Sequence, residues 1–164
     1  MGYKKLVASL GEMGQITMGV QGKEALERHD PEDPTSMSVG ELAAVHELGL
    51  GGQVSRSWCR AWIDDNAARM ARESATEFRA VMAGKITRNA ALIKLGYAWT
   101  ADMQKRMDDG RVTPPISAVT AARKGHNKPL IETYKLRDAV TYKIWLPQVR
   151  SIRSTAQRAA VRKR

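Results

Sequence analysis

Two short stretches of the chain alternate apolar and polar positions, one near each end. Residues 15–21 show this pattern first, and residues 140–146 repeat it before Pro147. A period of two is typical of β-strands that bury one face. We therefore predict two strands that form a small antiparallel sheet. The apolar positions of the two strands are Ile16, Met18, Val20, Val140, Tyr142, Ile144 and Leu146.

Between these stretches the apolar residues recur every three or four positions, which is the spacing of helices. Residues 58–83 form the longest such segment and end at Gly84, and a second long segment begins at Thr87, a suitable N-terminal cap, and ends at Gly110. The predicted apolar faces are Ile63, Ala67, Met70, Ser74, Phe78 and Val81 on the first helix, and Leu92, Leu95, Trp99, Met103 and Met107 on the second.

Shorter elements complete the predicted fold. Residues 22–37 are polar and aperiodic, which indicates an exposed loop. A short helix follows Ser117 and ends at Lys124, and a helical turn is expected near 133–137. The predicted fold class is α+β, a small antiparallel sheet packed by two long helices. We assign residues 1–147 to one domain and 148–164 to a basic C-terminal arm.

One further helix is signalled by its ends. Ser38 and Glu41 have the spacing of a capping box, and Met37 and Leu42 occupy the two positions of a hydrophobic staple. Gly49 stands where a left-handed C-terminal cap is expected. We therefore predict a helix from about residue 39 to 48, which buries Leu42, Val45 and Leu48.

Particular residues carry separate predictions. Gly96 lies inside the second long helix, where glycine costs roughly 1 kcal/mol relative to alanine, so we expect a neighbouring backbone to approach closely there. Trp62 and Trp99 lie on apolar stripes and are expected in the core. Trp145 falls on the polar face of its strand, and an exposed tryptophan is a suitable interface anchor. Arg56 and Arg60 flank Trp58, and arginine beside an aromatic residue is also typical of interfaces.

Composition adds an uneven charge to this picture. The chain has 164 residues, 43% of them hydrophobic, one cysteine and a net charge of +10. Residues 148–164 hold six basic residues and no acid, which leaves 21 basic and 17 acidic residues elsewhere. The arm is either a solvated terminus or a segment that contacts DNA or an acidic protein surface. Its basic residues are Arg150, Arg153, Arg158, Arg162, Lys163 and Arg164.

We find no residues in the sequence that assemble into an active site, a metal site or a cofactor site. His46-Glu47 lacks the second histidine of the helical zinc signature, and the loop histidines His29 and His126 have no ligand spacing to His46. We expect His46 and Glu47 to fix the helix end and the following loop by hydrogen bonds. Cys59 stands between two tryptophans and is expected to be a small core residue. No segment has the apolar length that crosses a bilayer.

Two separated motifs resemble those of tail-completion and neck proteins of long-tailed bacteriophages. Residues 43–49, Ala-Ala-Val-His-Glu-Leu-Gly, resemble a helix end of that family, and the next loop keeps its arginine and aromatic residue but neither of its prolines. Residues 124–136 resemble its closing segment, with Tyr134 where a glycine is usual. The motif and structural residues are Ser38, Glu41, His46, Glu47, Gly49, Arg56, Trp58, Lys128, Pro129, Leu130, Thr133 and Leu136.

The resemblance implies a non-enzymatic structural protein of the virion, made in the host cytoplasm. It would act at the top of the tail as a homo-oligomeric ring that completes the tail and joins it to the DNA-filled head. The implied partners are other copies of the chain, the tail terminator, tail tube or head-closing protein, and packaged DNA without sequence specificity. Two alternatives from other classes are a basic helical nucleic-acid-binding protein and a hydrolase that uses Cys59 and His46.

Overall fold

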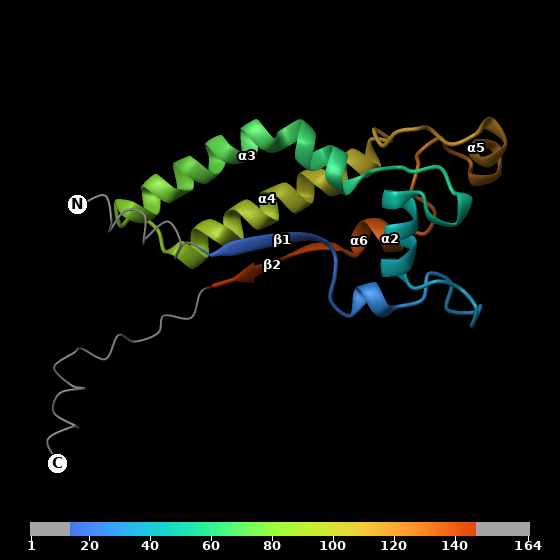
Figure 1. Cartoon of the computed structure of the whole chain (residues 1–164), viewed down its shortest axis with the longest axis horizontal. Helices are drawn as coiled ribbons and strands as arrows, with labels where there is room; N and C mark the ends of the chain where they lie inside the picture. Colours follow the sequence, from blue (N-terminus) through green and yellow to red (C-terminus); the bar gives the residue numbers. More distant parts are fainter. Residues whose placement is uncertain (1–13, 147–164) are drawn as a thin grey trace, which may run out of the picture. The chain divides into compact units, whose positions relative to one another are not determined.

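The computed structural model describes residues 14–146, and residues 15–145 form one compact unit. The predictions made for the arm at 148–164 lie outside the described residues. Figure 1 shows the order of the elements along the chain. They are β1 (Gln15–Val20), η1 (Glu24–Leu26), α2 (Val39–Leu48), η2 (Leu50–Gly52), α3 (Cys59–Met82), α4 (Arg88–Asp108), α5 (Ala118–Lys124), α6 (Lys135–Asp138) and β2 (Val140–Trp145).

The two strands pair as an antiparallel sheet, which confirms the predicted α+β class. Ile16 lies opposite Ile144, and Met18 lies opposite Tyr142. Because side chains alternate along a strand, this register places the apolar residues of both strands on one face. That face lies against α4, and α3 packs on α4 as the next layer (Figure 1). A two-stranded sheet is marginal alone, so this helix cover is what stabilises it.

Helix α4 is the centre of the core. All five residues of its predicted apolar face are buried, and the Thr87 hydroxyl accepts a hydrogen bond from the Ala90 N–H at 3.1 Å, as expected of its cap. The close approach at Gly96 is confirmed, but its partner is a side chain and not a backbone. A Cβ at this position would overlap the ring of Tyr142. Glycine is needed there because the β2 tyrosine lies directly against the helix.

The predicted apolar face of α3 is only partly buried: Met70 packs against the core, and Ser74, Phe78 and Val81 are half-buried. Ile63 is 37% exposed and Ala67 is also exposed, whereas Trp62 and Glu77 are the buried residues of this helix. The face turned toward α4 is largely polar, because α4 supplies partners for it. Five contacts join the helices through side chains: Trp62 Nε1 to Asp102 at 3.1 Å, Arg69 to Asp102 at 2.5 Å, Trp99 Nε1 to Glu73 at 2.6 Å, Lys94 to Glu77 at 2.5 Å, and Arg106 to Asp65 at 2.6 Å.

Helix α2 has the predicted ends but buries different residues. The Ser38 hydroxyl accepts from the Glu41 N–H at 3.2 Å while the Glu41 carboxylate accepts from the Ser38 N–H at 2.8 Å, and Gly49 is left-handed. The prediction that Leu42, Val45 and Leu48 are buried is wrong, since Leu48 is 57% exposed and the other two are half-buried. Val39 and Ala43 are buried instead, because the Trp58 indole donates to the Ala43 carbonyl and covers that side.

The remaining short helices lie near α2 at one end of the α3–α4 pair (Figure 1). The Ser117 hydroxyl caps α5 by accepting from the Thr120 N–H at 3.1 Å, and Gly125 ends the helix in a left-handed conformation. Both features confirm the sequence prediction. Helix α6 confirms the predicted turn and leads directly into β2. The fold therefore brings the first and second motif segments to the same end.

Candidate functional site

The Glu47 carboxylate joins the first motif to the start of α3. It accepts from the Ser57 hydroxyl at 2.8 Å and from the Trp58, Cys59 and Arg60 N–H groups at 2.8, 3.0 and 3.1 Å. Burial alone would raise the pKa of this carboxyl, but the four hydrogen bonds outweigh burial and hold its pKa below the ordinary value. The expectation that Glu47 fixes the helix end and loop is confirmed.

Arg56 and Trp58 tie the same loop to other parts of the chain. The Arg56 N–H donates to the His46 carbonyl at 2.6 Å, and its guanidinium donates to the Pro114 carbonyl at 3.0 Å. Trp58 is 4% exposed and packs in the core. Arg56 and Trp58 therefore have structural roles, because Arg56 crosses to the segment after α4 and Trp58 fills the interior.

The second motif segment packs beside the first. Pro129 and Leu136 are buried, Lys128 and Leu130 are half-buried, and Thr133 is exposed. Leu130 and Tyr134 have φ values of 62° and 61°. Such a conformation is uncommon for residues other than glycine and costs of order 1–3 kcal/mol each. Glycine adopts this left-handed conformation without that cost, and neither position is a glycine here.

The two motif segments line one cavity of about 310 Å³, which we call the His46 cavity. Its walls come from α2, the loop after it, α5 and the segment 130–136. The two segments are separated by more than 70 positions in the chain, and the sequence alone did not predict a shared cavity. The motif residues that line it are His46, Arg56, Leu130, Thr133 and Leu136.

Two histidines, His29 and His46, line this cavity. Both line its wall, and neither Nδ1 atom has a hydrogen-bond partner among residues 14–146 although both are buried. Burial, with Arg56, Lys124 and His29 nearby, lowers the pKa of His46. The His46 side chain makes no helix-end hydrogen bond through Nδ1, contrary to the prediction. Its backbone carbonyl makes the link to the loop instead.

The cavity gathers positive charge that sequence reasoning missed. Four cationic side chains and one carboxylate, that of Glu132, line it, so its formal charge is +3. None of the four cations forms an ion pair with a carboxylate in the described part of the chain. Burial lowers the pKa of Lys124, and Arg123 and Arg56 lower it further against the attraction of Glu132. The four cations are Arg56, Arg123, Lys124 and Lys135.

Cys59 has the environment of a structural thiol. Burial, and then the Glu47 carboxylate, raise its pKa to about 11. A thiol that stays protonated near pH 7 is a poor nucleophile, which counts against the hydrolase alternative. Residues 14–146 contain no group of three or more potential ligands placed to hold a metal ion. Within the same residues no helix is long and apolar enough to cross a membrane.

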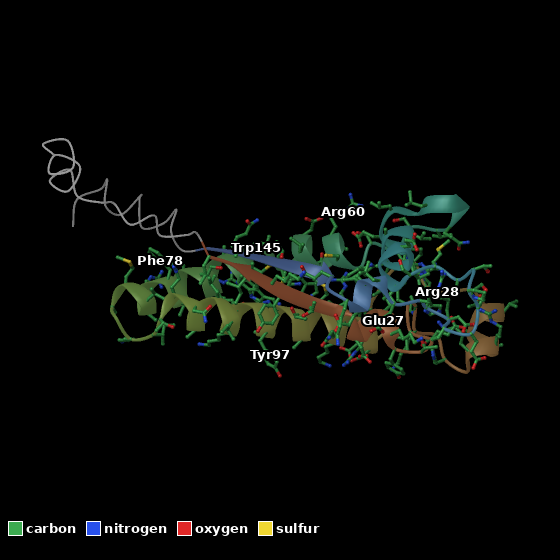
Figure 2. The ribbon with its side chains drawn as sticks, turned by 90° about the horizontal axis from the view of Figure 1, so that it is seen from below. Glu27, Arg28, Arg60, Phe78, Tyr97 and Trp145 are labelled. Carbon is green, nitrogen blue, oxygen red and sulfur yellow. The ribbon has the colours of Figure 1, made fainter. Side chains whose placement is uncertain are left out.

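The expected interface tryptophan is exposed. Trp145 is 59% exposed, and its indole N–H donates to the Thr17 hydroxyl at 3.3 Å on the sheet face away from α4. Figure 2 shows it at the opposite end of the molecule from Glu27 and Arg28. The predicted arm residues Arg150, Arg153, Arg158, Arg162, Lys163 and Arg164 are outside the described chain, so the structure does not place them.

Comparisons with known proteins add no family to these observations. No family model, no curated protein and no solved structure matches this chain.

Proposed function

We propose that this chain is a structural protein of a phage neck that completes the tail and helps join it to the head as an oligomeric ring. One observation carries the proposal. The two motif segments that resemble the tail-completion family, far apart in sequence, pack together and line a single cavity. Residues that meet in space in this way support the interpretation of both segments as parts of one motif.

The sheet offers surfaces for assembly. Among the described residues each strand has a single partner, so each retains one edge with unpaired backbone groups. Such an edge is a place where another chain can add a strand. The exposed Trp145 lies on the open face beside these edges. An aromatic anchor next to an open edge is the arrangement expected of a subunit that packs against its neighbours.

The test is complementation in a phage genome that encodes this chain. Deleting its gene should leave DNA-filled heads and separate tails in electron micrographs, and supplying the full chain in trans should restore joined particles. Trp145→Ala should restore fewer joined particles than Tyr97→Ala. Tyr97 is the matched control, because it is 70% exposed on α4 and away from the sheet (Figure 2).

Two results would count against this function. Normal joined particles without the gene would exclude a role in tail completion. Tight DNA binding by the purified chain in gel-shift assays, together with a defect in replication or expression, would instead favour the nucleic-acid-binding alternative. The copy number of the chain in purified virions is a further measurement. The proposal requires the chain to be present there at a constant copy number.

A further inference from the structure

An acidic loop, residues 30–35, lies next to α2 and carries three acids without a base. Asp30 and Asp33 shape the loop through their carboxylates, which accept from the Glu32 N–H at 3.0 Å and from the Thr35 N–H at 2.8 Å. The Glu32 carboxylate makes no hydrogen bond or ion pair within residues 14–146. Arg28 attracts the Asp33 carboxylate, and the exposed loop presents its remaining negative charge to the solvent.

The charge of this loop complements that of the His46 cavity. The loop contributes −3, and the cavity lining contributes +3. Arg56 and Lys135 donate to backbone carbonyls, whereas Arg123 and Lys124 make no side-chain hydrogen bond in the described chain. Arg123 is the more exposed of these two and is therefore the most available cation. Apolar walls at Leu42 and Leu130 also favour a peptide over a sugar–phosphate backbone, which has few apolar groups to place against them.

The loop cannot be the occupant of the cavity in its own chain as folded here. None of its residues lines that cavity, and Figure 1 places the loop on one side of α2 and α5 on the other. The two terminal segments have the wrong sign of charge to serve instead. Residues 1–13 contain two lysines and one glutamate, and residues 148–164 contain six basic residues and no acid.

We propose that the acidic loop of one copy binds the His46 cavity of the next copy, with Glu32 directed at Arg123 and Lys124. The proposal rests on the proposed homo-oligomeric function and names the surfaces that join its subunits. Loop and cavity are different surfaces of one chain, so the contact is head-to-tail, and such contacts generate a ring when the rotation between subunits closes. Pro31 and Pro34 limit the freedom of the loop, which lowers the entropy lost on binding.

Charge reversal tests this contact in the full-length chain. Self-association is measured by sedimentation velocity across a concentration series at low salt. Glu32→Lys and Arg123→Glu should each weaken association by about tenfold or more, because each places like charges together. Asp64→Lys and Arg79→Glu are the matched controls, exposed residues of α3 with no side-chain bond in the described chain. The controls should associate as the unmodified chain does.

Rescue separates the proposed contact from a folding defect. A chain with both Glu32→Lys and Arg123→Glu should regain association, because positions 32 and 123 have exchanged their charges and attract each other again. An equimolar mixture of the two single variants should also associate. In the mixture, the loop of each variant is opposite in charge to the cavity of the other at positions 32 and 123. Circular dichroism melting of every variant reports the fold independently. Equal weakening by test and control variants, or no recovery in the double variant and the mixture, would overturn the proposal.

The result is distinguishable from failure of the proposed function. If complementation shows a role in tail completion but Glu32→Lys and Arg123→Glu both join particles normally, only the contact is wrong. If the chain is not a virion component, the complementation test fails first. The loop–cavity contact is also overturned by a pair of results: the full chain stays monomeric at its highest soluble concentration, and its single variants complement fully.

Discussion

Glu47 illustrates how one side chain holds two elements together. Its carboxylate lies at the end of α2 and accepts three backbone N–H groups at the start of α3, where helices have unsatisfied donors and a positive dipole end. The Ser57 hydroxyl adds a fourth bond. No side chain at the α3 N-cap position, Trp58, performs this role. A residue eleven positions earlier in the sequence therefore acts as the cap.

Glu47→Gln should destabilise the protein at pH 7 by about 1–3 kcal/mol, the usual scale for hydrogen bonds to a charged group. Because the pKa of Glu47 is lower in the folded state, its stabilisation is present above the unfolded pKa, near the ordinary 4.5, and is lost as pH falls through the folded value. Urea unfolding of both proteins at a series of pH values measures this, and the difference between them should shrink on acidification.

The control for this variant is Glu27→Gln, an exposed glutamate whose side chain makes no hydrogen bond in the described chain (Figure 2). It should leave the unfolding free energy unchanged within about 0.5 kcal/mol. A constant difference between Glu47→Gln and the unmodified protein over the whole pH range would contradict the role assigned to the carboxylate.

Gly96 gives a second residue-scale prediction in which two effects oppose each other. Alanine would favour the helix by roughly 1 kcal/mol, but its Cβ would overlap the Tyr142 ring, and overpacking costs typically 1–3 kcal/mol. We expect Gly96→Ala to lower the unfolding free energy in urea titrations. Adding Tyr142→Leu should remove the penalty, so the cost of Gly96→Ala should be smaller or reversed in that background. Stabilisation by Gly96→Ala alone would show that the ring moves aside freely.

At the scale of elements, α3 is an amphipathic helix that buries its apolar stripe only in part. Its contact with α4 is built from charged and indole groups, and an Arg69 guanidinium lies 5.7 Å from the Trp62 ring centre. Buried or half-buried polar groups are tolerated only with partners, and each of these has one. The choice of face thus follows from which partners α4 presents and not from the hydrophobicity of α3 alone.

This choice of face predicts unequal costs for neighbouring substitutions. Trp62→Ala should cost about 3–5 kcal/mol, because a fully buried indole is lost and the Asp102 carboxylate loses a donor. Ile63→Ser, one position along the same helix, should cost less than about 1 kcal/mol, since the isoleucine is already partly exposed. Chemical denaturation of the two variants gives the comparison. Equal costs would mean that α3 is rotated relative to the structure.

At the scale of the whole molecule, the core of the described residues runs from Val39 in α2 to Val140 in β2. Residues 148–164 carry six positive charges and lie beyond the residues that the structure describes. A deletion separates what this arm contributes to stability from what it contributes to assembly.

Deletion of residues 148–164 should leave the melting temperature of the folded unit unchanged but reduce tail–head joining in extracts. The expected loss is greatest at low salt, since exposed charges are screened beyond about 8 Å at physiological ionic strength. Replacing the arm by a neutral segment of equal length is the control for length, and it should behave like the deletion. Joining that is as efficient with the truncated chain at both low and high salt would show that the arm is only a solvated terminus.

Local rules in the sequence determined the elements and most of their ends. Ser38, Thr87 and Ser117 each cap the helix they were assigned, and Gly49 and Gly125 end theirs in the left-handed conformation that glycine adopts without cost. The alternation in the two strands also determined their common face. These features depend on neighbours within a few positions, so the chain specifies them before any tertiary contact forms.

Tertiary structure alone decided which faces are buried and which residues meet. Leu48 and Ile63 are exposed because other faces of their helices are the ones covered, by Trp58 on α2 and by the polar side chains of α4 on α3. The hydrophobic periodicity of a helix does not predict which of its faces a neighbour covers. The His46 cavity likewise joins residues separated by long stretches of chain, and its excess charge appears only when their distances are known. Hydrophobic burial is non-directional, so pattern predicts that a face is covered, whereas packing decides what covers it.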